Sequence, residues 1–311
     1  MDIGWATLDT LGGKTVLRFE RRLAHPPEKV FRAISDPAEL RHWFPATVET
    51  ELRPGAPITF AFEQHEIDAL RGEVLEVEPP KLLVYTWGDD VLRWEIVPEG
   101  GGCRLFFSQT LAEGGASGGV PGTARNAAGW EVCLAALQAR LDGEPAPNVD
   151  WFPLFESYVE RFGLAEGTVH ASEDGFVVHF ERDVVQTPEQ VWTVLTEDAE
   201  PAVGTPAPRR FAPTPPGRVI AVDPGRAIEL EGEEGRVRWQ LEPRVPGSLI
   251  VVEQTLPALR PAVPAAWQVH LELLVAALQG IERCWPDERV TALEARYAER
   301  LGAPGRPVRT R

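Results

Sequence analysis

The chain has 311 residues, of which 43% are hydrophobic, and its formal net charge at neutral pH is −16. This length suffices for two domains of ordinary size, each with its own core. The acidic balance argues against binding to nucleic acid, whose phosphates require a basic surface, and against binding to anionic membranes. The three cysteines form no CxxC motif, and no secretory segment follows Met1, so we expect a reduced, cytoplasmic protein. No apolar run approaches the roughly 20 residues of a membrane-spanning helix.

The first predicted elements are a strand, a turn and a helix. Residues 16–22 form a β-favouring run, and the segment His25-Pro26-Pro27 ends it because proline has no backbone donor for a sheet. Apolar residues at helical spacing then predict a helix over 28–35, followed by a short helical turn over 37–44.

The next part of the chain alternates hydrophobic and polar residues, with tight turns between the runs. This pattern is typical of antiparallel strands with one face on a core. The segment Arg53-Pro54-Gly55 is the turn between the first two strands, and Gly100-Gly101-Gly102 makes the last hairpin. The predicted strands cover residues 47–52, 58–62, 70–77, 83–87, 92–96 and 105–107.

A glycine-rich loop over Gly114–Gly122 leads into a long helix predicted at about 126–141. Its apolar stripe is spaced at the helical period, and Gly143 ends it, as glycines often do at helix C-termini. A terminal helix is predicted at about 151–162. Consecutive strands followed by segregated helices indicate an α+β domain, in which a curved antiparallel sheet wraps the long helix.

The whole pattern then repeats. Phe19-Glu20-Arg21 returns as Phe180-Glu181-Arg182, 161 residues later, whereas Arg93-Trp94 returns as Arg238-Trp239 at an offset of 145 residues. The second copy has therefore lost 16 residues between these motifs. Matches that keep their order and offset indicate homologous units. We predict two tandem domains, residues 1–164 and a shortened copy at 165–303 that lacks about two strands, and then a disordered tail over 304–311.

The motifs PPEKVFRAISDPAELRHWFP, GEVLEVEPPKLLVYTW and GWEVCLAALQARLDG resemble the START-like, or SRPBCC, superfamily. Within it, the likeness is to homologues of the activator of heat-shock protein 90 ATPase. The resemblance implies two helix-grip domains, each an antiparallel sheet around a long C-terminal helix, with a cavity for an apolar small molecule or a site for a partner protein. In the second copy, the proline-rich tract Pro201–Pro216 replaces the strands 47–52 and 58–62, and the segment Trp43-Phe44-Pro45 has no counterpart.

The common motifs of catalysis and phosphate binding, such as HExxH, GxSxG and GxGxxG, do not occur in the sequence. We therefore expect no catalytic residue, no cofactor and no metal. His65 lies among Glu63, Glu66 and Asp68, which could bind a metal, but a solvated edge is the favoured interpretation. The pairs Glu20-Arg21 and Glu181-Arg182 are interpreted as cross-strand ion pairs kept for folding rather than as a site.

Aromatic side chains mark the predicted ligand site. Trp94 and Trp130 also suit an ordinary core, because the second copy keeps them as Trp239 and Trp267. Tyr85 and Trp87 become Leu230 and Gly232, so the second core does not need them and they suit a cavity wall. The predicted ligand-binding residues are Trp43, Phe60, Phe62, Tyr85, Trp87, Trp94, Trp130 and Leu134.

Three functions stay open. The first is a non-catalytic protein that binds a hydrophobic small molecule in the first domain, for which a large cavity would speak. The second is a chaperone-associated or stress-related interaction module, a monomer whose repeats pack as an intramolecular pseudo-dimer; a filled core with an exposed apolar patch would favour it. The third is a cyclase- or hydrolase-like enzyme, which would need a titratable group facing the cavity.

Overall fold

A computed structural model describes residues 4–62, 69–112, 119–173, 175–197, 199–214, 217–244 and 246–302. The predicted tail over 304–311, His65 with its acidic neighbours, and residues 114–118 of the glycine-rich loop lie outside this part of the chain. Tertiary contacts divide the chain into two compact units, Met1–Phe162 and Gly163–Arg311, which are described separately below.

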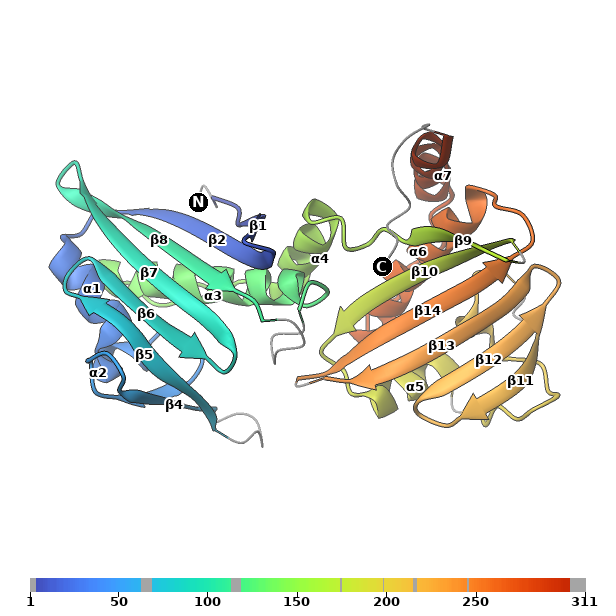
Figure 1. Cartoon of the computed structure of the whole chain (residues 1–311), viewed down its shortest axis with the longest axis horizontal. Coiled ribbons are helices and arrows are strands. Elements are labelled where there is room, and N and C mark those ends of the chain that lie inside the picture. Colours follow the sequence, from blue (N-terminus) through green and yellow to red (C-terminus); the bar gives the residue numbers. More distant parts are fainter. Residues whose placement is uncertain are drawn as a thin grey trace. The chain divides into compact units, whose positions relative to one another are not determined.

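The first unit is built on an eight-stranded antiparallel sheet with the strand order β1-β2-β8-β7-β6-β5-β4-β3 (Figure 1). Two short helices connect β2 to β3, and two longer helices follow β8. The strands are β1 (Thr7–Leu11), β2 (Lys14–Leu23), β3 (Thr47–Thr50), β4 (Pro57–Ala61), β5 (Leu70–Glu78), β6 (Leu82–Trp87), β7 (Asp90–Glu99) and β8 (Gly102–Thr110), and the helices are α1 (Pro27–Ser35), α2 (Pro37–Leu40), α3 (Thr123–Asp142) and α4 (Trp151–Arg161).

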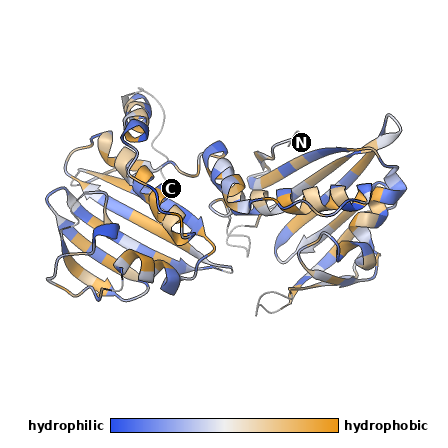
Figure 2. Ribbon diagram, turned by 180° about the vertical axis from the view of Figure 1, so that it is seen from behind, coloured by the Kyte–Doolittle hydropathy of each residue, from blue (hydrophilic) through white to orange (hydrophobic). Residues whose placement is uncertain are grey.

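Helix α3 lies along one face of this sheet, as the views from opposite sides show (Figures 1 and 2). Its apolar stripe is buried at Trp130, Leu134, Leu137 and Leu141. Gly143 ends the helix in the left-handed conformation, with φ of 77°, and its amide donates back to the last turn. The sequence therefore predicted this helix correctly, apart from three additional residues at its start and one at its end. The α+β fold, with a sheet around a long helix, is confirmed.

The second unit repeats the plan with a six-stranded antiparallel sheet of order β11-β12-β13-β14-β10-β9. Its strands correspond in sequence to β1, β2 and β5–β8, and the described residues between α5 and β11 contain no counterpart of β3 or β4. The strands are β9 (Thr168–Ser172), β10 (Gly175–Val184), β11 (Arg218–Asp223), β12 (Ala227–Gly232), β13 (Gly235–Pro243) and β14 (Ser248–Leu256), and the helices are α5 (Pro188–Thr196), the short 3-10 helix η1 (Arg209–Phe211), α6 (Ala262–Leu278) and α7 (Asp287–Gly302).

A glycine at the start of the same strand pair shows how closely the two sheets agree. A Cβ atom on Gly72 would lie 2.0 Å from the carbonyl oxygen of Thr86 on the neighbouring strand. Its counterpart Gly217 would place a Cβ atom 2.2 Å from the carbonyl oxygen of Glu231. Real Cβ atoms do not approach that closely, so both sheets require a residue without a side chain here.

Candidate ligand site

The predicted aromatic side chains of the first domain come together between the sheet and α3. Alternation along β6 turns Tyr85 and Trp87 to the same side, where both contact the ring of Phe60 on β4, with ring centroids 5.9 Å and 4.5 Å away. The ring centroid of Trp130 on α3 lies 5.8 Å from that of Trp94 and 6.4 Å from that of Trp87. Trp43 contacts Trp94, Phe62 contacts Trp87, and Leu134 is buried one turn beyond Trp130.

Two further aromatic residues of the cluster were missed in the sequence. Phe44 connects the aromatic residues of the sheet to that of α3. Its ring centroid lies 5.4–6.1 Å from those of Phe60, Trp87 and Trp130. Phe107 of β8 stacks on Trp94 at 3.9 Å. The signals were present: Phe44 follows Trp43 directly, and Phe107 alternates with Leu105 on the last strand.

Burial varies along the cluster. Phe60 and Trp94 are fully enclosed, with exposed fractions of 0%, whereas Phe62 and Trp87 are only half-buried. The cluster thus reaches the surface at Phe62 and Trp87 and ends inside the domain at Trp94.

A small cavity adjoins this cluster among α1, α2 and strands β3–β6. Its volume is about 10 Å³, close to the minimum that holds one water molecule. Of the predicted site residues, Phe60 and Tyr85 line it, and the others pack in the cluster beside it. The described lining residues are mainly apolar: Ile34, Ser35, Leu40, Val48, Thr50, Leu52, Ile58, Phe60, Val74, Leu83 and Tyr85.

Tyr85 contributes the polar group of this wall that is left without an acceptor. The hydroxyls of Ser35 and Thr50 donate to backbone carbonyls, at 2.7 Å and 3.1 Å. The Tyr85 hydroxyl accepts from Trp94 Nε1 at 3.2 Å, but no described residue accepts its own proton. Tyr85 is 4% exposed, and this burial raises the pKa of its phenol far above the usual value. The group is therefore a neutral, buried hydrogen-bond donor.

A chain of buried hydrogen bonds anchors Trp130 to the sheet. Trp130 Nε1 donates to Gln109 Oε1 at 2.8 Å, and Gln109 Nε2 donates to Asp90 at 2.7 Å. The second domain keeps the first of these bonds, since Trp267 Nε1 donates to Gln254 Oε1 at 2.5 Å. A bond present in both domains supports the fold rather than a site in one of them.

In the first Glu-Arg pair, Glu20 forms the predicted cross-strand ion pair and Arg21 does not. Glu20 of β2 pairs with Arg104 of the neighbouring β8, at 2.6 Å, as predicted. For Arg21 the prediction is wrong: its side chain turns inward and pairs with Glu131 of α3, which also accepts from the Tyr158 hydroxyl at 2.6 Å. Arg21 pairs with the helix rather than with a neighbouring strand because the inner face of β2 packs against α3.

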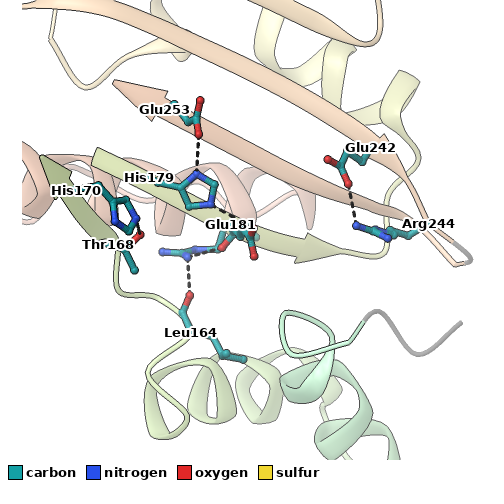
Figure 3. Close-up of polar contacts among 9 residues, drawn as sticks. Leu164, Thr168, His170, His179, Glu181, Glu242, Arg244 and Glu253 are labelled. Carbon is teal, nitrogen blue, oxygen red and sulfur yellow. Dashed lines mark hydrogen bonds and ion pairs between the residues drawn. The ribbon is translucent and has the colours of Figure 1, made fainter. Parts of the chain in front are cut away.

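In the second domain, Arg182 occupies the place of Arg21, but the acid on the central helix is replaced by Gln268. The guanidinium donates instead to the carbonyl oxygen of Leu164, at 2.6 Å (Figure 3). It also donates to the carbonyl oxygen of Ala165. Its burial lowers the pKa of Arg182 to about 10. The arginine is thus a structural tie between β10 and the chain that leads into it.

The interior of the second domain is filled by its own proline-rich tract. Phe211 of η1 is fully buried, with its ring centroid 5.7 Å from that of Trp239. Trp239 Nε1 donates to the carbonyl oxygen of Phe211 at 2.9 Å, and His270 Nε2 donates to that of Arg210 at 2.8 Å. Burial lowers the pKa of His270 to about 4, so the ring is neutral. A tract with no strand pattern therefore still supplies core, which the sequence analysis missed.

The comparison with protein families matches residues 24–142 to the family described as Activator of Hsp90 ATPase homolog 1-like protein. This match confirms the predicted resemblance over residues 24–142 of the first domain. The matched range runs from the end of β2 to the end of α3, so it contains the cavity and the aromatic cluster. The second copy lies outside the match, in keeping with its replaced strands. The comparison with curated proteins gave no match.

Solved structures resemble about half of this chain at a time. EF2215 from Enterococcus faecalis, a conserved protein of unknown function, is 19% identical, with a TM-score of 0.44, over 51% of this chain and 90% of its own. CalU16 from Micromonospora echinospora is 20% identical, with a TM-score of 0.40, over 52% and 96%. The BPP1335 product of Bordetella parapertussis is 22% identical, with a TM-score of 0.37, over 51% and 91%. At these values the likenesses carry no functional argument.

Outside the aromatic cluster, a group of polar side chains lies on β10 and β14 of the second domain. The two ring nitrogens of His179 lie 3.2 Å from Glu181 and 3.1 Å from Glu253 (Figure 3). The hydrogen bond to Glu181 is the main reason why the pKa of His179 is raised. In the described ranges, no trio of His, Cys, Asp or Glu side chains could hold a metal ion, and no helix is long and apolar enough to cross a membrane.

Proposed function

We propose that the first domain binds a small hydrophobic molecule between α1, α2, strands β3–β6 and the aromatic cluster. The observation that carries this proposal is Tyr85, a buried donor without an acceptor at the wall of an apolar cavity. Buried donors in proteins nearly always have an acceptor, so a hydroxyl proton without a described acceptor at a cavity marks a position for a ligand atom. The second domain has Leu230 at this position and therefore lacks the donor.

The ligand enlarges the cavity as it enters, because about 10 Å³ is far below the volume of any organic molecule. The elements around it suit such a movement. Strand β3 is the edge of the sheet, with β4 as its one neighbouring strand, and α2 is a single turn of four residues. Displacement of Phe44, whose ring contacts those of Phe60 and Trp87, opens the aromatic cluster beside the cavity.

A second candidate is an interaction module that binds a protein, as the name of the matched family suggests for a chaperone ATPase. The small volume of the cavity among the described residues favours this candidate, because a domain that acts through its surface needs no large cavity. Leu52, 40% exposed at the end of β3, would then belong to the contacting surface.

Two measurements on the full chain test the proposal. Native mass spectrometry of freshly purified protein should show a small-molecule adduct, whereas a stable complex with a protein would support the second candidate. In a titration with ethylbenzene, Trp87→Ala should weaken binding, and the control change Trp239→Ala in the second domain should leave it intact. Binding that survives Trp87→Ala but is lost on Trp239→Ala would place the ligand in the second domain and refute the proposal.

A further inference from the structure

The two domains treat the same interior position in opposite ways. In the second domain, donors on the sheet and on the central helix are both used: Trp239 and His270 donate to the carbonyl oxygens of Phe211 and Arg210. These carbonyls belong to η1, which enters from the tract between α5 and β11. The second domain therefore carries a built-in occupant that consists of an aromatic ring and two carbonyl groups.

The first domain keeps the sheet donor but directs it differently. Trp94, the counterpart of Trp239, donates to the Tyr85 hydroxyl at 3.2 Å, and Tyr85 then holds a proton for which no described residue is the acceptor. A hydroxyl that accepts one hydrogen bond becomes a stronger donor in the next. In the first domain, Tyr85 therefore accepts from the sheet tryptophan and offers its own proton in turn. Among the described residues, no carbonyl group takes the place that the carbonyl of η1 has in the second domain.

We infer that the ligand of the first domain is a neutral, apolar carbonyl compound, such as an aryl ketone or an ester, whose oxygen accepts a hydrogen bond from Tyr85. This inference rests on the proposed function and adds the chemical class of the ligand. Its apolar part lies among the rings of Phe60, Trp87 and Phe44, as Phe211 lies against Trp239 in the second domain.

The charges around the site exclude an anionic ligand. The described residues that line the cavity include no Lys, Arg or His side chain. Arg21, which turns inward from β2, is already paired with Glu131. A carboxylate brought to this interior would be desolvated without a counter-charge, which costs far more than a single hydrogen bond from Tyr85 returns.

The test compares acetophenone with ethylbenzene, which differ by a carbonyl in place of a methylene group. For the wild type and Tyr85→Phe, we take the ratio of the two dissociation constants, ethylbenzene over acetophenone, by calorimetric titration of the full chain. Loss of one hydrogen bond should lower this ratio by roughly three- to tenfold in Tyr85→Phe. The control is Tyr158→Phe, whose hydroxyl already donates to Glu131, and this variant should keep the wild-type ratio.

The outcomes separate the two proposals. If ethylbenzene binds and Tyr85→Phe leaves the ratio unchanged, the carbonyl inference is wrong while the proposed function stands. If neither compound binds the wild type, both are wrong. A second readout needs no variant: the carbonyl stretching frequency of acetophenone bound to the wild type should fall below its value in an alkane solvent. An unshifted band would overturn the inference.

Discussion

Tyr85 and Leu230 occupy the same position in the two sheets, and the first carries a phenol where the second carries an aliphatic side chain. In the first domain that hydroxyl accepts from Trp94, and in the second the equivalent indole donates to the backbone of η1 instead. Each tryptophan is therefore satisfied, but only the first domain gains a buried donor that faces no described acceptor. At this scale the asymmetry between the domains is a matter of hydrogen-bond partners rather than of hydrophobicity.

The buried leucines of the two central helices should be equally costly to remove. Leu134 and Leu271 are 2% and 0% exposed, and truncation of either leaves a cavity that the packed rings around it cannot fill. We expect Leu134→Ala and Leu271→Ala each to lower the free energy of unfolding by about 2–5 kcal/mol, as measured by urea denaturation. A loss below about 1 kcal/mol would show that the stripe is not a core.

His179 should make the stability of the second domain depend on pH. Its pKa is raised in the folded protein, first by the hydrogen bond to Glu181 and also by that to Glu253. A raised folded-state pKa stabilises the protein below the unfolded-state value of 6.5, and this stabilisation is lost as the pH rises through the folded-state pKa. His179→Gln should therefore be more destabilising at about pH 5.5 than at about pH 9.

The matched variant Glu253→Gln removes one of the two carboxylates that hold the imidazolium. In this background the pH dependence of the His179→Gln effect should be smaller, because the folded-state pKa is raised less. Chemical denaturation at both pH values measures the effect. A His179→Gln cost that is the same at both would refute the assignment of a charged, paired ring.

At the level of elements, periodicity decided what could be predicted. The spacing of apolar residues predicts helix α3 and the strands of the first sheet. Alternation along β6 alone predicts that Tyr85 and Trp87 lie on one side of the strand. Spacing carries no information about partners distant in sequence, so the pairing of Arg21 with Glu131, 110 residues away, was missed. The size of the cavity could not be predicted either, since its lining residues come from two helices and four strands that are distant in sequence.

Element η1 illustrates a second limit. A tract of prolines between α5 and β11 offers neither alternation nor helical spacing, because proline lacks a backbone donor. The largest side chain that it contributes to the core is Phe211, which contacts Trp192 and Trp239. A lone aromatic residue between Arg210 and Ala212 gives no pattern from which its burial can be derived.

Phe211 should consequently be one of the more important side chains of the second domain. We expect Phe211→Ala to lower the free energy of unfolding of this domain by about 3–5 kcal/mol. Phe106→Ala provides the control, because Phe106 is 37% exposed on β8 and its removal leaves no closed cavity. If the two variants prove equally stable in urea denaturation, the Phe211 side chain of η1 is not an important part of the core of the second domain.

At the scale of the whole molecule, each domain has its own sheet, its own central helix and its own buried tryptophans. The first domain has strands β3 and β4 at the edge of its sheet. The second has no counterpart of these strands among its described residues, and η1 places Phe211 in its interior. We propose that the first domain alone carries the ligand and that the second stabilises the protein.

The proposed boundary can be tested by dividing the chain. Residues 1–164 should fold on their own, because the partners named for the aromatic cluster and for Glu131 all lie within this range. Circular dichroism and a cooperative urea transition would measure this. A fragment without a cooperative transition would show that the first domain depends on the second.

The most direct test of the account follows the indole N–H resonances of the full chain by NMR during a titration with acetophenone. With the ten tryptophans assigned by substitution, the signals of Trp87 and Trp94 should shift, and those of Trp239 and Trp267 should not. The Trp94 signal reports on the bond to Tyr85, and the Trp239 signal reports on the bond to Phe211. Shifts confined to Trp239 and Trp267, or no shift at any tryptophan, would contradict a ligand site in the first domain.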